Sequence, residues 1–199
     1  MIYFVTGIGT DCGKTLVSAI LTQALGEAYW KPIQSGLPAD TDTVKSLVSH
    51  LNAKFHTEAY RFKQALSPHA AAAYENTAIN LDDIQLPVFE KDLVIEGAGG
   101  ILVPLNSEHF VIDLASKFEA EVILVSDIYL GSINHTLLTI NELRRRNLSL
   151  KGIVFNHAGN EATESIILSH AACPCLLRIE KENYINQTTI VKYAERFKI

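Results

Sequence analysis

Apolar and polar positions along the chain divide it into two kinds of segment. Several apolar runs are unbroken, which is typical of parallel strands covered on both faces. These runs predict strands at Ile2–Val5, Ala28–Lys31, Leu93–Glu96, Val122–Val125, Gly152–Asn156 and Cys175–Ile179. Helical patterns lie between them at Lys14–Leu25, Thr41–Leu51, Val111–Phe118, Ser132–Arg146, Glu161–Ala171 and Gln187–Phe197. The alternation predicts an α/β fold, a three-layer, mostly parallel sheet with helices on both faces.

Composition fits one globular domain over residues 1–199, with 48% hydrophobic and 20% charged residues. The net charge of −5 includes no basic tract beyond Arg144-Arg145-Arg146, which reads as a solvated helix end, so we expect no nucleic-acid partner. No apolar stretch approaches the ~20 residues of a membrane span, so we expect no membrane partner either. The three cysteines form no even disulfide framework, and no export signal is evident. These features predict a cytoplasmic protein with reduced thiols.

The stretch from Val5 to Leu16, VTGIGTDCGKTL, places glycines between the first strand and the first helix. Glycines bring backbone N–H groups close to phosphate oxygens, and the helix N-terminus favours the same anion. Lys14 would contact the β- and γ-phosphates, and the Thr15 hydroxyl would bind Mg²⁺. The alternative is an ordinary glycine turn, but a lysine in the first helical turn opposes the helix dipole unless an anion lies there. We therefore predict a fold of the P-loop NTPase type.

Acidic and basic residues also follow the second and third strands, where ligands of such sheets gather. Lys31 ends the second strand beside Pro32, although a lysine there is more often a surface residue. Glu96 ends the third strand before a glycine-rich run, where its carboxylate would complete a Mg²⁺ site. Asp40 and Asp42 lie at the start of a helical pattern, and either could be merely its N-cap.

Taken together, these segments resemble the dethiobiotin synthetase family over most of the chain. The shared segments are Val5-Thr6-Gly7, Gly13-Lys14-Thr15, Lys31-Pro32, Ser35-Gly36, Ser67-Pro68-His69, Glu96-Gly97-Ala98-Gly99-Gly100 and Leu130-Gly131-Ser132-Ile133-Asn134-His135. The five residues between Gly7 and Gly13, one more than in the common phosphate loop, are a trait of that family. The resemblance implies an ATP- and Mg²⁺-dependent enzyme that carboxylates 7,8-diaminononanoate with CO₂ and closes a cyclic urea.

The resemblance also assigns roles to residues. It implies that Lys14 and Lys31 stabilise charge during phosphoryl transfer, and that Thr10 and Ser35 hold substrate or phosphate oxygens. Mg²⁺ would be bound by Thr15, Asp42 and Glu96, with Asp42 preferred to Asp40, as in the family. The implied nucleotide contacts are Asp11, Cys12, Gly13, Lys14, Thr15, Leu16, Asp42, Glu96, Gly97, Ala98, Gly99, Asn156 and His157.

The substrate carboxylate would lie at the start of the helix after Leu130, with Ser35, Leu130, Gly131 and Asn134 as substrate contacts, across the interface of a homodimer. Asn156 matches the asparagine that contacts adenine in the family. Alternatively, it only caps the end of its strand. His157 stands where an aspartate is common in the family, and the region after Leu177 is shorter than in the family. Because of these two departures, the sequence does not assign which nucleotide base the protein prefers.

Cys12 is unusual, because the family has a valine at this position. One hypothesis is that the loop and Lys14 make its thiol reactive. The alternative is that Cys12 is an inert residue in a small apolar slot under the loop.

Two other function classes fit a phosphate loop. A partitioning-type ATPase would carry an additional lysine early in the loop, where this chain has Ile8 and Gly9. A small-molecule kinase would leave its phosphate on the product.

Overall fold

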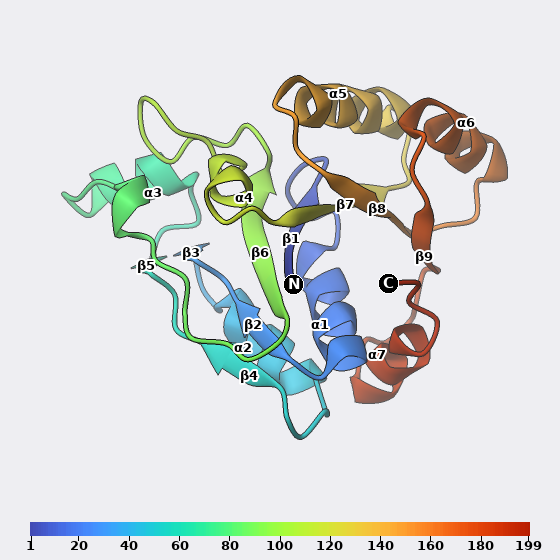
Figure 1. Cartoon of the computed structure of the whole chain (residues 1–199), viewed down its shortest axis with the longest axis horizontal. Coiled ribbons are helices and arrows are strands. Elements are labelled where there is room, and N and C mark those ends of the chain that lie inside the picture. The colour runs from blue at the N-terminus through green and yellow to red at the C-terminus, as the bar shows by residue number, and fades with distance from the viewer.

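A computed structural model describes residues 1–199 and contains one central sheet of seven strands (Figure 1). The strand order is β4-β2-β6-β1-β7-β8-β9, and every pairing in the sheet is parallel. The strands are β1 (Ile2–Gly7), β2 (Ala28–Trp30), β4 (Lys54–His56), β6 (Leu93–Gly100), β7 (Glu121–Asp127), β8 (Leu150–Asn156) and β9 (Cys175–Ile179). The expected mostly parallel sheet is confirmed.

Helices cover both faces of this sheet and complete the three layers. One face packs against α1 (Lys14–Leu25), α2 (Asp40–Leu47) and α7 (Gln187–Ala194), through buried side chains such as Val17, Val44 and Ile190. The opposite face packs against α4 (Asp113–Lys117), α5 (Ser132–Arg145) and α6 (Glu161–Ala171). Figure 1 shows α5 and α6 above the sheet, with α1 and α7 below it.

The sequence pattern predicted every long element but missed five of the short ones. The bounds of α1 and α6 agree with the expectation, whereas α2 begins one residue earlier and ends at Leu47. The missed elements are β3 (Ile33–Ser35), β4, β5 (Tyr60–Phe62), α3 (Pro68–Tyr74) and a 3₁₀ turn at Leu81–Asp83. Three-residue strands are too short to establish a period, so β3 and β5, which form a separate two-stranded sheet, had no sequence signal.

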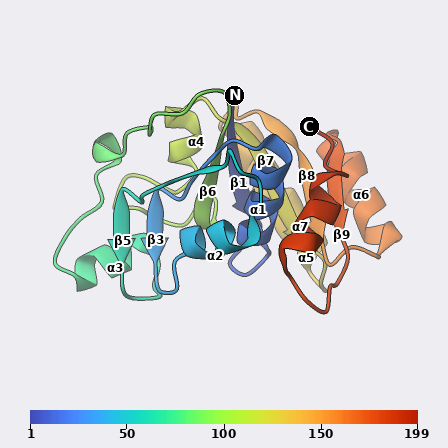
Figure 2. The ribbon, with the colours of Figure 1, turned by 90° about the horizontal axis from the view of Figure 1, so that it is seen from below.

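Parallel pairing brings the carboxyl ends of the strands to one edge of the molecule. Val5 of β1 lies opposite Glu96 of β6, and Trp30 of β2 lies opposite Ile95, so Lys31 follows beside Glu96. Figure 2 shows both chain termini at one end, while the arrowheads of β3 and β5 point toward the other. The polar residues after β1, β2 and β6 therefore share one edge of the sheet.

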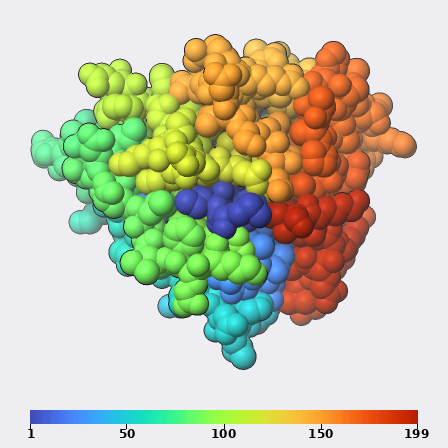
Figure 3. All heavy atoms as spheres, in the orientation of Figure 1, coloured from blue at the N-terminus to red at the C-terminus, as the bar shows by residue number.

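The N-terminus lies at the opposite edge, between segments distant in sequence (Figure 3). Its ammonium group is 2.7 Å from Oδ1 of Asp92, just before β6, and 2.6 Å from the carbonyl oxygen of Lys91. No helix in the chain has the length and apolar character needed to cross a bilayer.

Candidate active site

The loop between β1 and α1 is shaped by two glycines that accept no larger residue. A Cβ on Gly7 would lie 2.0 Å from Sγ of Cys12, and one on Gly13 would lie 2.5 Å from Nδ2 of Asn156. Gly13 also has φ of 98°, in the left-handed region that favours glycine. The loop residues expected from the sequence therefore form a tight turn immediately before α1.

Lys14 begins α1 and lies along this loop. It is 7% exposed, and its Nζ donates to the carbonyl oxygen of Gly9 at 2.8 Å. No acidic side chain occurs in the first turn of α1 to oppose a bound anion. The positive end of the helix and the ammonium group of Lys14 therefore act together on the same pocket.

Cys12 fills the space beneath the loop. Its side chain is buried at 3% exposure in the apolar cluster under α1, and its Sγ donates to the carbonyl oxygen of Gly9 at 3.3 Å. A reactive cysteine needs access to solvent as well as a favourable charge. This placement favours the inert alternative over the reactive hypothesis.

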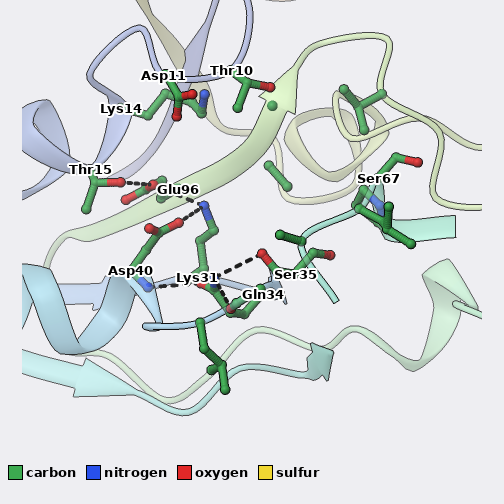
Figure 4. Close-up of a pocket in the computed structure, with 18 of the residues that line it drawn as sticks. Thr10, Asp11, Lys14, Thr15, Lys31, Gln34, Ser35, Asp40, Ser67 and Glu96 are labelled. Atoms are coloured by element: carbon green, nitrogen blue, oxygen red, sulfur yellow. Dashed lines mark hydrogen bonds and ion pairs between the residues drawn. The ribbon is translucent and has the colours of Figure 1, made fainter. Parts of the chain in front are cut away.

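Glu96 is the centre of a buried polar cluster (Figure 4). It is 1% exposed, and its Oε1 accepts hydrogen bonds from Oγ1 of Thr15 at 2.8 Å and from Nζ of Lys31 at 3.0 Å. The same Nζ donates to the carbonyl oxygen of Gly97 at 3.0 Å. A hydroxyl from α1, an ammonium group from the residue after β2 and a carboxylate from β6 therefore meet at a single point.

Lys31 is held in this cluster by two carboxylates. Its Nζ lies 2.6 Å from Oδ2 of Asp40 and 3.0 Å from Oε1 of Glu96, while the residue is only 3% exposed. Burial lowers the pKa of Lys31, but the charges of Glu96 and Asp40 raise it by more, and the pKa lies above its ordinary value. Lys31 is therefore a charged, buried residue rather than the surface lysine that its sequence position also allowed.

The choice of Asp42 over Asp40 is not supported by their positions. Both belong to the first turn of α2, but the side chain of Asp42 is 68% exposed and lies 3.8 Å from Arg61. Asp40 lines the pocket instead and contacts Lys31. The buried Gln34 explains the difference, because its Oε1 accepts the backbone N–H of Asp40 at 3.0 Å and its Nε2 donates to Gly36. This amide anchors the first residue of α2 beside Lys31.

A pocket of about 920 Å³ opens over this cluster (Figure 4). Ser35 lines it, with a buried Oγ that has no hydrogen-bond partner within the protein. Of the residues expected from the sequence, the pocket gathers Thr10, Asp11, Gly13, Lys14, Thr15, Lys31, Ser35, Glu96, Ala98 and Gly99. It also includes residues that sequence reasoning gave no role, namely Gln34, Gly36, Leu37, Pro38, Asp40, Ala65, Leu66, Ser67, Pro68 and Val103. The shared Ser67-Pro68 segment was the one signal available for the α3 side of the pocket.

Neither Asn156 nor His157 is among the residues that line the pocket. Asn156 is 4% exposed, and its Nδ2 donates to the carbonyl oxygen of Cys12 at 3.1 Å. His157 is exposed, with its Nδ1 2.7 Å from Oδ1 of Asp127 at the end of β7. Asn156 therefore supports the phosphate loop directly, whatever else it contacts.

The remaining expected residues lie outside the pocket lining. These are Cys12, Leu16, Asp42, Gly97, Leu130, Gly131 and Asn134. Leu130 and Asn134 are exposed at the start of α5, so this chain's own pocket does not include them.

Solved structures with the same architecture include a plasmid partition protein from Borrelia burgdorferi. It matches with a TM-score of 0.58 and 12% identity, covering 98% of this chain and 96% of that chain. The septum site-determining protein MinD of Pyrococcus horikoshii, complexed with Mg-ADP, matches with a TM-score of 0.56 and 14% identity, covering 98% and 93%. At these identities the likeness establishes the α/β fold and nothing further.

Sequence relatives are much closer. The AAA domain family matches residues 2–189. An ATP-dependent dethiobiotin synthetase from Cytophaga hutchinsonii is 55% identical over 194 residues, covering 96% of this chain and 94% of that protein. A second one, from Christiangramia forsetii, is 46% identical over 198 residues, covering 98% and 95%. Because this likeness extends over nearly the whole length of both proteins, the chain belongs to the family of ATP-dependent dethiobiotin synthetases.

Proposed function

We propose that this chain is an ATP-dependent dethiobiotin synthetase, a cyclo-ligase that joins CO₂ to 7,8-diaminononanoate and converts ATP to ADP and phosphate. The observation that supports this most directly is the buried Lys31, held between two carboxylates in the pocket that also contains the phosphate-loop Lys14. The additional lysine of a partitioning-type ATPase would lie early in the loop, where this chain has Ile8 and Gly9, whereas Lys31 directly follows β2.

The proposed reaction has three bond-forming steps. One amine of the substrate attacks CO₂, loses a proton and becomes a carbamate. A carbamate oxygen then attacks the γ-phosphorus of ATP, and the bond to ADP breaks. The second amine attacks the carbon of this mixed anhydride and loses a proton, and phosphate departs as the cyclic urea closes. Negative charge is present on the carbamate, on the phosphoryl group in transfer and on the departing ADP.

The residues of the pocket suit these charges. Lys14 and Lys31 supply fixed positive charge in a largely buried site, where electrostatic stabilisation is strongest. Thr10 and Ser35 also line the pocket and would bind substrate or phosphate oxygens. The chain therefore contributes mainly orientation and charge, as is typical of phosphoryl transfer.

The oxygen donors of the cluster fit Mg²⁺, a hard cation that prefers carboxylate and hydroxyl ligands together with phosphates. Thr15, Glu96 and Asp40 would hold it, with Asp40 replacing Asp42 because Asp40 faces the pocket. When bound, the ion would neutralise charge on the phosphates. Nucleotide contacts are proposed for the loop from Asp11 to Leu16, for Gly97, Ala98 and Gly99, and for Asn156 and His157.

We also propose that the protein is a homodimer, with the start of α5 at the interface. Tyr129, Leu130, Ile133 and Leu138 are exposed apolar residues of this region, and Leu130 is completely exposed. Leu130, Gly131 and Asn134 would then reach the substrate bound by the partner. Light scattering should give about twice the 21.9 kDa mass of one chain, and Leu130→Asp should reduce it to one chain. A monomeric unmodified protein would contradict this arrangement.

The decisive experiment supplies diaminononanoate, bicarbonate and Mg-ATP to the purified protein. We expect free phosphate, ADP and the ring-closed urea in equal amounts, detected by mass spectrometry and a phosphate assay. A phosphorylated organic product would indicate a small-molecule kinase. A rate of ATP hydrolysis that is the same with and without the diamine would indicate a partitioning-type ATPase. Omitting the diamine serves as the control for uncoupled hydrolysis.

A further inference from the structure

Tyr29 approaches the carboxylate of Glu96 from outside the pocket. Tyr29 lies opposite Val94 of β6, two residues before Lys31, which directly follows β2, and Glu96 lies two residues after Val94 on the same face of β6. The Tyr29 hydroxyl donates to Oε2 of Glu96 at 2.9 Å. Tyr29 itself is completely buried and is not among the residues that line the pocket. It therefore contacts the carboxylate without contacting the space where ligands bind.

The two oxygens of Glu96 have different partners. Oε1 accepts from the hydroxyl of Thr15 and the ammonium group of Lys31, both of which line the pocket. Oε2 accepts from Tyr29 alone among the hydrogen bonds of the protein. The ring of Tyr29 is itself fixed in the apolar cluster under α1, next to Phe55 at a centroid distance of 6.3 Å. The Tyr29 hydroxyl is therefore a rigid donor.

We infer that Tyr29 is a positioning residue of the nucleotide–metal site. Its hydroxyl holds Oε2 in the core and so directs Oε1 of Glu96 toward Thr15 and the pocket. The inference rests on the proposed role of Glu96 at the bound Mg-nucleotide.

Tyr29→Phe tests this, because it removes the hydroxyl and keeps the packed ring. Calorimetric titration with ADP at a series of Mg²⁺ concentrations measures the half-saturating Mg²⁺ concentration without any diamine present. We expect that concentration to rise about tenfold in Tyr29→Phe, as is usual when a partner of a metal-binding group is removed. Nucleotide binding in the absence of Mg²⁺ should be unchanged.

Tyr3→Phe is the matched control. Tyr3 belongs to the same apolar cluster and is 2% exposed, but its hydroxyl lies 3.9 Å from Sδ of Met1, away from the site. It should leave the half-saturating Mg²⁺ concentration unchanged. An equal effect of both variants, or no effect of Tyr29→Phe, would overturn the inference.

A double-mutant cycle separates positioning from general loosening of the core. In a Glu96→Ala background, Tyr29→Phe should cause no further change in Mg²⁺ dependence, because the side chain that Tyr29 positions is gone. The same tenfold change in that background would also refute the inference. Since these titrations use only ADP and Mg²⁺, their result is independent of whether the chain produces dethiobiotin.

Discussion

Lys31→Gln is expected to lower turnover by roughly 30- to 1000-fold, corresponding to about 2–4 kcal/mol of transition-state stabilisation from one fixed charge in a largely dry site. The glutamine amide retains some hydrogen bonding to Glu96 and to the carbonyl oxygen of Gly97, but it cannot neutralise charge on the carbamate or the transferred phosphoryl group. Single-turnover kinetics with saturating substrates measures this step directly.

The burial of Lys31 adds a second expected effect. Glu96 and Asp40 lose the cation between them, and leaving a buried charge without its partner costs about 3 kcal/mol. The free energy of unfolding of Lys31→Gln should therefore fall, so turnover must be measured well below the unfolding temperature of the variant.

Lys54→Gln provides the control for removal of a lysine. Lys54 is exposed and pairs with Glu90 at the surface, where such pairs contribute little to stability. Both its turnover and its stability should match those of the unchanged protein. Full turnover of Lys31→Gln would remove Lys31 from the chemistry and restore the interpretation that it is only structural.

The sequence was sufficient to predict that Lys31 and Glu96 lie at the same edge of the sheet. Each ends a continuous apolar run, and parallel strands place such ends along one edge of the sheet. β2 and β6 are neighbours in the sheet but lie far apart in the chain, and the pattern alone did not specify that they pair. Strand order depends on how the crossover helices pack over both faces, which a one-dimensional pattern does not record.

The sequence also did not predict that the charged Lys31 is buried, or that Asp40 lies beside it. A lysine followed by proline is as compatible with the protein surface as with a buried active site. Aspartates are ordinary residues in the first turn of a helix, so the sequence does not distinguish Asp40 from Asp42. What distinguishes them is the turn between β3 and α2, where Gln34 bonds to Gly36 and to the backbone N–H of Asp40. That turn follows a three-residue strand that had no periodic signal.

Asn156 shows that the sequence pattern does not predict contacts between distant segments of the chain. Both sequence interpretations placed it at the end of a strand, facing adenine or capping the strand. Its amide also donates to the phosphate loop, at the carbonyl oxygen of Cys12, 144 residues earlier in the chain, and neither interpretation foresaw this contact. The adenine contact stays a prediction. Long-range support of this kind depends on the β1–β7–β8 order of the sheet.

Asp40 and Asp42 provide the sharpest test of the revised metal site, because they lie two residues apart in the same helical turn. Asp40→Asn should lower turnover at limiting Mg²⁺ by roughly 100-fold, the loss typical of removing one preorganised charged group from an active site. Its carboxylate contacts Lys31 and lines the pocket. The half-saturating Mg²⁺ concentration should rise in the same variant.

Asp42→Asn is the matched comparison. Its side chain is 68% exposed, and its nearest cation, Arg61, lies 3.8 Å away. Pairs of this kind contribute about 0–1 kcal/mol, so turnover should stay within about threefold and the half-saturating Mg²⁺ concentration should not change. If Asp42→Asn proved the more damaging of the two, α2 would have to turn by about 160° on nucleotide binding to exchange the two side chains, since residues two apart lie nearly opposite on a helix. The pair of variants therefore determines which carboxylate of α2 serves the bound nucleotide.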